Sequence, residues 1–381
     1  MTSQDASIAL VVTTTVFSTV VFLAVARTLL YPVQPKTLRN PLKEGVYDKS
    51  NADKVKNLVY QPDQFPGARD VETPYGSIRV YEFGPEEGEK VLFVHGISTP
   101  CVTLAPIALA LAKRGYRIML FDLFGRGFSD GVADIPHDAR LYVSQILMVL
   151  ASSPLAWTGI NGFRLVGYSL GGGIAIHFAN AFPHLVRDLV LLAPAGLIRA
   201  ASFGRVSRFL FVSGLVPERL LAIATRRRLQ KPIAASARPA RETPVETIAT
   251  PTLNVAEAEV VPVSGAAVTP LEHRVMEYVR WMVTHHNGFV PSFMSSIRFA
   301  PLMEQHDAWA KLSMRAPGTT AVLLATSDEI ISAVDYRKEA LSLIGGEDHV
   351  RWRVLPGSHD FVMTHPQDIL REINDMWATK E

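Results

Sequence analysis

The chain has 381 residues, of which 48% are hydrophobic and 19% are charged, and its formal net charge is +2. A chain of this length can bury a large hydrophobic core without disulfides or metal ions to stabilise it. Its net charge shows no basic excess of the kind that marks nucleic-acid-binding domains. The single cysteine, Cys101, excludes an intramolecular disulfide and fits a reducing compartment. We expect its thiol to be a small buried side chain, with a place in the wall of a binding site as the alternative.

An uncharged segment of 21 residues runs from Ala6 to Ala26. At about 1.5 Å per residue, a helix of this length spans the roughly 30 Å hydrocarbon core of a bilayer. Residues 1–30 are therefore predicted to form a transmembrane anchor. A cleaved signal peptide is the main alternative, because Ala24-Val25-Ala26 resembles a cleavage site. A buried helix of a soluble protein is the other.

Basic residues such as Arg27 and Lys36 follow this segment. The positive-inside rule then predicts a single-pass membrane protein whose main domain lies in the cytosol. Cleavage of a signal peptide would instead give a secreted protein.

Residues 31–68 are rich in Pro, Asn and Lys and are predicted to be a linker. Beyond it, short apolar runs alternate with helical patterns, which indicates a mostly parallel sheet with helices on both faces. The predicted strands are Ser77–Phe83, which we expect to be antiparallel, and Lys90–His95, Arg117–Phe121, Phe163–Tyr168, Leu189–Ala193, Thr319–Ala325 and Val350–Leu355. The predicted helices are Pro106–Arg114, Asp138–Ser152, Leu170–Phe182, Ala333–Leu343 and Pro366–Ala378.

The alternation breaks between residues 197 and 317, which contain helical patterns but no clear buried strand. We expect a core of residues 69–196 and 318–381, with 197–317 inserted as a helical lid. Within the insertion, residues 231–270 are rich in Pro, Ala, Thr and Glu and are predicted to be a flexible loop. The run Arg226-Arg227-Arg228 is either a solvated helix end or part of a lid helix that rests on anionic lipid.

Ser169 lies in the sequence Gly167-Tyr168-Ser169-Leu170-Gly171, between a predicted strand and a predicted helix. This context is typical of a nucleophile elbow, in which a sharp turn lifts the serine hydroxyl out of the edge of the sheet. A Gly-rich structural turn is the alternative. The amides at the start of the following helix suit a developing oxyanion, so we expect Leu170 to donate one N–H to it and Ile97 to donate another.

A nucleophilic serine needs a base and an acid that orients the base. His359 follows the last predicted strand on a loop that contains glycine, and Asp328 follows the strand before it. We predict that they act as base and acid, with Glu329 as the alternative acid. Gly96 and Tyr168 are expected to contact the substrate, whereas His95 is expected to order its own loop by hydrogen bonds. No residue spacing indicates a metal site, and this chemistry needs no cofactor.

These segments resemble the α/β-hydrolase superfamily. They are His95–Ser98, Phe121–Asp130, Gly167–Gly172, Thr326–Glu329 and Gly357–Asp360, and they occur in the order that the superfamily has. The resemblance implies the α/β-hydrolase fold, with a mostly parallel eight-stranded sheet and a helical lid, and Ser169, Asp328 and His359 as a triad. The pattern Asp122-x-x-Gly-x-Gly-x-Ser129 is similar to that of the lid-bearing branch, which includes membrane-anchored monoacylglycerol lipases and esterases.

Three hypotheses follow for the function. The first is a membrane-anchored serine hydrolase that cleaves a carboxylic ester, because a lipophilic substrate, a small-molecule or lipid ester, partitions into the membrane where the enzyme resides. The second is a hydrolase of carbon–carbon or amide bonds that uses the same triad. The third is a protein that binds a ligand without turnover. The sequence leaves the substrate and the oligomeric state open.

Overall fold

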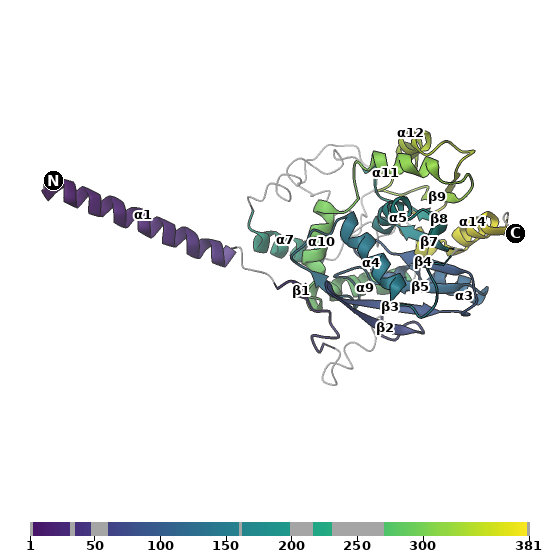
Figure 1. The fold of residues 1–381 in the computed structure, drawn as a ribbon, viewed down its shortest axis with the longest axis horizontal. Coiled ribbons are helices and arrows are strands. Elements are labelled where there is room, and N and C mark those ends of the chain that lie inside the picture. Colours follow the sequence, from purple (N-terminus) through teal and green to yellow (C-terminus); the bar gives the residue numbers. More distant parts are fainter. Residues whose placement is uncertain are drawn as a thin grey trace.

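Eight strands form one sheet at the centre of the body (Figure 1). The computed structural model describes residues 3–30, 35–46, 60–159, 162–198, 216–230 and 270–378. The strands are β2 (Ala68–Thr73), β3 (Gly76–Phe83), β4 (Lys90–Val94), β5 (Arg117–Phe121), β7 (Phe163–Tyr168), β8 (Val186–Leu192), β9 (Thr320–Ala325) and β10 (Arg351–Leu355). Their order across the sheet is β10-β9-β8-β7-β4-β5-β3-β2.

The strands from β10 to β5 in this order pair in parallel, and β3 pairs antiparallel with both β5 and β2. Parallel strands are covered on both faces, which explains their continuous apolar runs. All the predicted strands are present. The prediction missed β2, whose side chains alternate between exposed and half-buried. It is an edge strand that carries Arg69, Asp70 and Glu72, and charged side chains of this kind protect sheet edges.

Helices cover both faces of the sheet (Figure 1). The chain steps from β4 to β5 in one direction and then returns past β4 to β7 and β8 in the other. Because crossovers between parallel strands are right-handed, the first helix and the next two lie on opposite faces. These three helices are α3 (Ala105–Lys113), α4 (Ala139–Ala151) and α5 (Leu170–Ala181), and the last two helices of the core are α12 (Ala333–Leu343) and α14 (Pro366–Ala378). The reversal at β4 makes the carboxyl ends of β4 and β7 the usual place for a ligand site.

Helices replace the alternating pattern between β8 and β9. They are α7 (Glu218–Gln230), α9 (Pro270–His285), α10 (Phe289–Phe299), α11 (His306–Ala310) and the short helix η3 (Lys311–Met314). The helices α7, α9 and α10 contact one another, and α9 buries Val275, Tyr278 and Met282. The predicted flexible loop, about 231–270, lies outside the described residues apart from Pro270.

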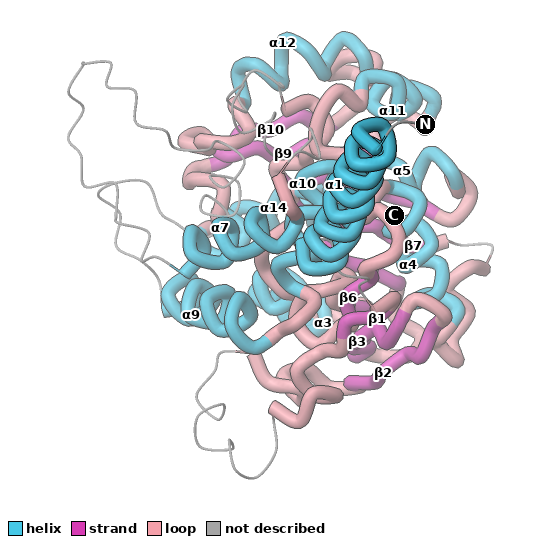
Figure 2. Tube along the Cα trace, turned by 90° about the vertical axis from the view of Figure 1, so that its left-hand side faces the viewer, coloured by secondary structure: helices cyan, strands magenta, loops and turns pink. Residues whose placement is uncertain are grey.

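The N-terminal helix α1 (Ser3–Leu30) extends away from the body (Figures 1 and 2). Within the described part of the chain, it is the one helix long and apolar enough to cross a membrane, over Ser7–Leu29. A signal sequence near an N-terminus has the same properties. The hydroxyls of Thr13, Thr14 and Thr15 each donate to a carbonyl four residues earlier, so these polar side chains need no water.

Two parts of the expected linker pack against the body. Residues Thr37–Leu38 form β1, which pairs antiparallel with β6 (Gly131–Val132). The buried Asn40 donates from its side chain to Asp130 at 2.7 Å. Farther along, Tyr60 is buried in the core. Residues 31–34 and 47–59 lie outside the described part.

Candidate active site

Ser169 occupies a strained turn between β7 and α5. Its φ of 53° lies in the region that side chains other than glycine rarely adopt. A Cβ on Gly171 would lie 2.1 Å from the Val94 carbonyl oxygen, and one on Gly167 would lie 2.4 Å from the Gly171 carbonyl oxygen. The tight turn therefore requires glycine on both sides, and it holds the serine hydroxyl at the carboxyl end of the central strand.

His359 joins Ser169 to Asp328 by two hydrogen bonds. Its Nε2 lies 3.0 Å from the Ser169 Oγ, and its Nδ1 lies 2.7 Å from the Asp328 Oδ2. A carboxylate can only accept, so Nδ1 carries the proton and the unprotonated Nε2 accepts from the serine hydroxyl. The Asp328 Oδ1 accepts from the amides of Ile330 and Ile331 at 2.9 and 2.7 Å, which fixes the plane of the carboxylate. The structure thus brings together the three residues that the sequence analysis singled out, although they lie up to 190 positions apart.

Gly96 and Ile97 lie directly after β4, next to the start of α5. His95 holds this loop in place, since its Nε2 accepts from the Leu123 amide and its Nδ1 donates to the Gly96 carbonyl, both at 2.8 Å. Burial lowers the pKa of His95 to about 3, so it is a neutral hydrogen-bonding residue and not a base. Leu170 is the first residue of α5, and the first amides of a helix have no partner inside the helix.

Tyr168 precedes Ser169 and packs against the imidazole. Its ring centroid lies 5.4 Å from that of His359, and its hydroxyl donates to the His359 carbonyl at 2.9 Å. The side chain is fully buried. This geometry lets Tyr168 hold the histidine loop in place, and its contact with the substrate stays a prediction.

Arg126, which was not among the predicted site residues, is fully buried beside this site. Its guanidinium donates to the Ile97 carbonyl at 2.9 Å and to the Ser296 hydroxyl of α10 at 2.8 Å. The residue lies inside the segment Phe121–Asp130, in which the prediction rested on the Asp, Gly and Ser positions alone. Its place in that segment is the one sequence signal that could have pointed to a buried arginine joining the Ile97 loop to the inserted helices.

Asp122, from the same segment, orders the neighbouring loops. Its carboxylate accepts from the Cys101 and Phe128 amides and from the Tyr60 hydroxyl. The Cys101 thiol is buried and lies 3.2 Å from that hydroxyl, which agrees with a small buried side chain.

A pair of buried carboxyl groups links α9 to the histidine loop. The Glu272 and Asp360 side chains are both buried, and they interact with each other electrostatically. Burial raises the pKa of Asp360 to about 7, with a further increase from Glu272. Two adjacent carboxylates repel each other, so Asp360 keeps its proton up to about neutral pH. Asp360 also accepts from the Ser358 hydroxyl at 2.6 Å, which places the pair directly beside the residue that contacts Ser169.

The three residues of the predicted triad, Ser169, His359 and Asp328, are enclosed. Ser169 is 3% exposed, and the side chains of His359 and Asp328 are fully buried. Burial strengthens hydrogen bonds and dipoles in the site. Within the described ranges, no group of three or more His, Cys, Asp and Glu side chains is placed to hold a metal ion.

Comparison with known proteins agrees with this geometry. Residues 85–244 match the family described as serine aminopeptidase, S33. The chain is 30% identical over 153 residues to an uncharacterised protein of Mycobacterium tuberculosis, which covers 39% of this chain and 41% of that protein. It is 33% identical over 124 residues to a serine hydrolase-like protein of Dictyostelium discoideum, covering 30% of this chain and 32% of that protein. The matched regions thus span less than half the length of these relatives.

Solved structures resemble the whole body. A bacterial membrane phospholipase A superposes with a TM-score of 0.57 at 17% identity, covering 96% of this chain and 98% of that one. The carboxylesterase CesB of Bacillus subtilis superposes with a TM-score of 0.57 at 15% identity, covering 88% of this chain and 98% of that one. Likenesses at such low identity report on the fold, and the predicted fold class is confirmed.

Proposed function

We propose that this chain, which belongs to the α/β-hydrolase superfamily, cleaves a carboxylic ester through an acyl-enzyme on Ser169. One observation carries the proposal: the imidazole of His359 is hydrogen-bonded to the Ser169 hydroxyl on one side and to the Asp328 carboxylate on the other. A serine hydroxyl is a weak nucleophile at neutral pH, and an oriented neutral imidazole is the group that activates it.

The reaction follows from this arrangement. His359 accepts the Ser169 proton as the oxygen attacks the ester carbonyl, and Asp328 stabilises the imidazolium that forms. The imidazolium then protonates the departing alcohol, which leaves the acyl group on Ser169. Water, activated by the same imidazole, releases the acid and restores the serine.

The oxyanion that forms in each step needs donors close to Ser169. We assign this role to the backbone amides of Leu170 and Ile97. Leu170 begins α5, so its N–H points out of the helix start, where the helix dipole also favours negative charge. Ile97 lies on the loop that His95 and Arg126 hold by hydrogen bonds to Gly96 and Ile97.

We assign the helices between β8 and β9 to a lid over this site. Arg126 joins the Ile97 loop to α10, and Glu272 joins α9 to the histidine loop. Both contacts couple the inserted helices to residues next to Ser169, which is 3% exposed, so we expect an opening step before the substrate binds. Specificity then depends on the lid and not on the triad.

A lipophilic ester is the substrate class that we favour, and α1 is the reason. A helix that anchors the enzyme in a bilayer places it where apolar esters concentrate. Among the proteins of similar fold, one is named a membrane phospholipase A and another a carboxylesterase. An amide substrate is the second candidate, because the matched family is described as a serine aminopeptidase.

The test is a panel of p-nitrophenyl esters of increasing acyl length, with an aminoacyl p-nitroanilide as the amide arm. We expect kcat/KM to rise from acetate to medium-length chains for the wild type. Ser169→Ala should abolish turnover of every ester. Turnover of the anilide alone would replace the ester assignment with the amide one.

Membrane anchoring has its own test. We expect the full chain to stay in the pellet after alkaline carbonate extraction of membranes. Its mass should also still include residues 1–30. Release into the supernatant, or loss of those residues, would replace the anchor with a signal peptide.

A further inference from the structure

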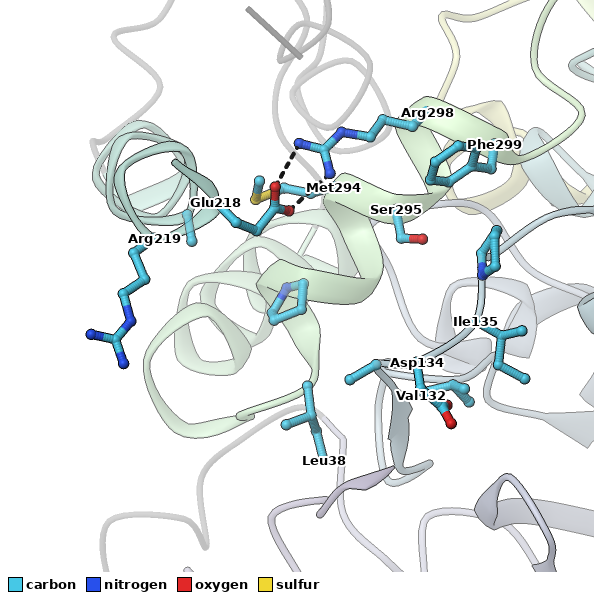
Figure 3. A pocket seen from close by; sticks show the side chains of 14 residues that line it. Leu38, Val132, Asp134, Ile135, Glu218, Arg219, Met294, Ser295, Arg298 and Phe299 are labelled. Carbon is cyan, nitrogen blue, oxygen red and sulfur yellow. Dashed lines mark hydrogen bonds and ion pairs between the residues drawn. The ribbon is translucent and has the colours of Figure 1, made fainter. Parts of the chain in front are cut away.

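A cavity of about 380 Å³ lies away from Ser169, between α7, α10 and the segment that follows β6. Figure 3 shows Leu38 and Val132 on one side of it and Met294 and Phe299 of α10 on another. Most of its lining side chains are apolar. Its charged lining residues are Asp134, Arg219 and the ion pair in which Arg298 donates to both oxygens of Glu218, at 2.8 and 3.0 Å. A cavity of this size and lining suits an apolar chain better than a polar ligand.

The cavity adjoins the point where α1 meets the body. Arg219, which lines the cavity, donates to the Leu29 carbonyl at the end of α1 at 2.9 Å. The chain returns to the cavity wall at Leu38, and eight residues reach at most about 28 Å. In Figures 1 and 2, α1 leaves the body on the side that carries α7, β1 and β6. If α1 crosses a membrane, the mouth of the cavity lies close to the membrane surface.

Exposed apolar side chains collect on the same side. Outside α1, eight large hydrophobic side chains are exposed in the described residues, and four of them border this cavity or lie on α7. These four are Ile135 (38% exposed), Leu220 (52%), Ile223 (47%) and Phe299 (50%). The other four are spread over separate elements, so they form no comparable patch.

The helix α7 combines this apolar face with positive charge. Leu220 and Ile223 are three residues apart and therefore share one face of the helix. Arg226 and Arg227 follow in the next turn and are exposed. A helix with large apolar side chains on one face and arginines beside them is typical of binding to the interface of anionic membranes.

The docking face is defined here as Ile135, Leu220, Ile223, Phe299, Arg226 and Arg227. We infer that this docking face rests on the anionic lipid surface of the membrane that α1 crosses, and that the cavity behind it takes up the acyl chain of a membrane lipid. The inference rests on the part of the proposed function that makes α1 a membrane anchor. It does not depend on the reaction at Ser169.

The test uses the full chain in vesicles that contain lipids with a nitroxide on the acyl chain. A bimane label on Ile223→Cys reports contact with the lipid. The matched control is Leu109→Cys, since Leu109 is 40% exposed and lies on α3, opposite α1 in Figure 1. The native Cys101 is 1% exposed and stays unlabelled. We expect several-fold stronger quenching at position 223, because interfacial helices enter the bilayer by about 5–10 Å.

Two vesicle compositions separate the contributions of charge and apolar contact. Quenching at position 223 should be stronger with about one fifth phosphatidylglycerol than with phosphatidylcholine alone, because basic residues near the surface are attracted by anionic lipid. The pair Arg226→Glu and Arg227→Glu should remove this gain. Equal quenching in both vesicles would overturn the role of anionic lipid.

The remaining outcomes overturn the docking itself. One is equal quenching at positions 223 and 109 while the protein floats with the vesicles. Another is energy transfer between labels at position 223 on two copies without quenching, which would assign the docking face to a protein contact. Failure to float would remove the anchor, whereas ester turnover, measured in the same sample, reports separately on the proposed reaction.

The cavity has its own readout. A phosphatidylcholine with a diazirine at the end of one acyl chain should cross-link to the peptide that contains residues 289–299. Ala222→Trp, which places an indole in the cavity wall, should reduce this cross-link several-fold while the quenching at position 223 stays. Cross-links confined to α1 in the wild type would overturn acyl-chain binding in the cavity.

Discussion

Replacing Asp328 by Asn tests how His359 is oriented. The change keeps the shape of the side chain but replaces one carboxylate oxygen by an NH₂ group. In the structure, Oδ1 accepts from two backbone amides at 2.9 and 2.7 Å, so the amide oxygen of the introduced side chain is held there. Its NH₂ group must then point at Nδ1 of His359, which in the wild type donates to Oδ2 at 2.7 Å.

The imidazole responds to this change by exchanging its tautomer. Nδ1 becomes the acceptor, so Nε2 carries the proton and can no longer accept one from Ser169. The variant also has no negative charge to stabilise the imidazolium, and the side chain is fully buried, so solvent does not replace it. The same exchange in a serine protease triad costs about 10⁴ in kcat. We expect a loss of about 10³–10⁴, which corresponds to about 4–5.5 kcal/mol of transition-state stabilisation.

The assay is p-nitrophenyl butyrate hydrolysis, with kcat and KM measured separately. The loss should fall on kcat, because Asp328 contacts the histidine and not the substrate. Glu329→Gln is the matched control, since Glu329 is exposed and adjacent. The control should keep its activity within about twofold, as is usual for surface substitutions. An Asp328→Asn variant that retains more than a tenth of wild-type kcat, with an unchanged melting temperature, would refute the assigned tautomer.

Further predictions concern the turn, the histidine loop and the buried acid pair. Gly171→Ala should lower both activity and melting temperature, because its Cβ would lie 2.1 Å from the Val94 oxygen; an active, equally stable variant would contradict the strain. Tyr168→Phe removes the hydrogen bond to the histidine loop. It should lower the free energy of unfolding by about 1 kcal/mol and raise the activation free energy that sets kcat by about the same amount, with KM unchanged. A rise in KM alone would point to substrate contact instead. The pKa of Asp360 is raised to about 7, so its stabilising contribution is present at acidic pH and is lost as pH rises through about 7. Glu272→Gln should therefore flatten the fall in melting temperature between pH 5 and 8, and an unchanged pH profile would refute the contribution of Glu272 to the raised pKa of Asp360.

The sequence predicts most of the sheet because parallel strands leave a strong pattern. Runs such as Arg117–Phe121 and Phe163–Tyr168 are buried along nearly their whole length, so they read as apolar segments between polar turns. The edge strand β2 has no such pattern, since only alternate side chains are partly covered. The pairing of Thr37–Leu38 with β6 was also missed, because two residues are too few to show a period.

The catalytic triad was predictable because the fold restricts where its three residues can lie. Ser169, Asp328 and His359 each follow a strand in a parallel sheet, and the carboxyl ends of such strands meet at one edge. Arg126, Glu272 and Asp360 could not be found this way. Their roles depend on contacts between the core and the inserted helices, and those contacts come from tertiary packing and not from local pattern.

Covalent labelling with a fluorophosphonate, followed by peptide mapping, tests the central assignment most directly. The reagent reacts with an activated serine and leaves a stable phosphonyl adduct. The account predicts one adduct on Ser169 in the wild type and none in Ser169→Ala, with both proteins equally stable. An adduct on another serine, or labelling that persists in the alanine variant, would contradict it.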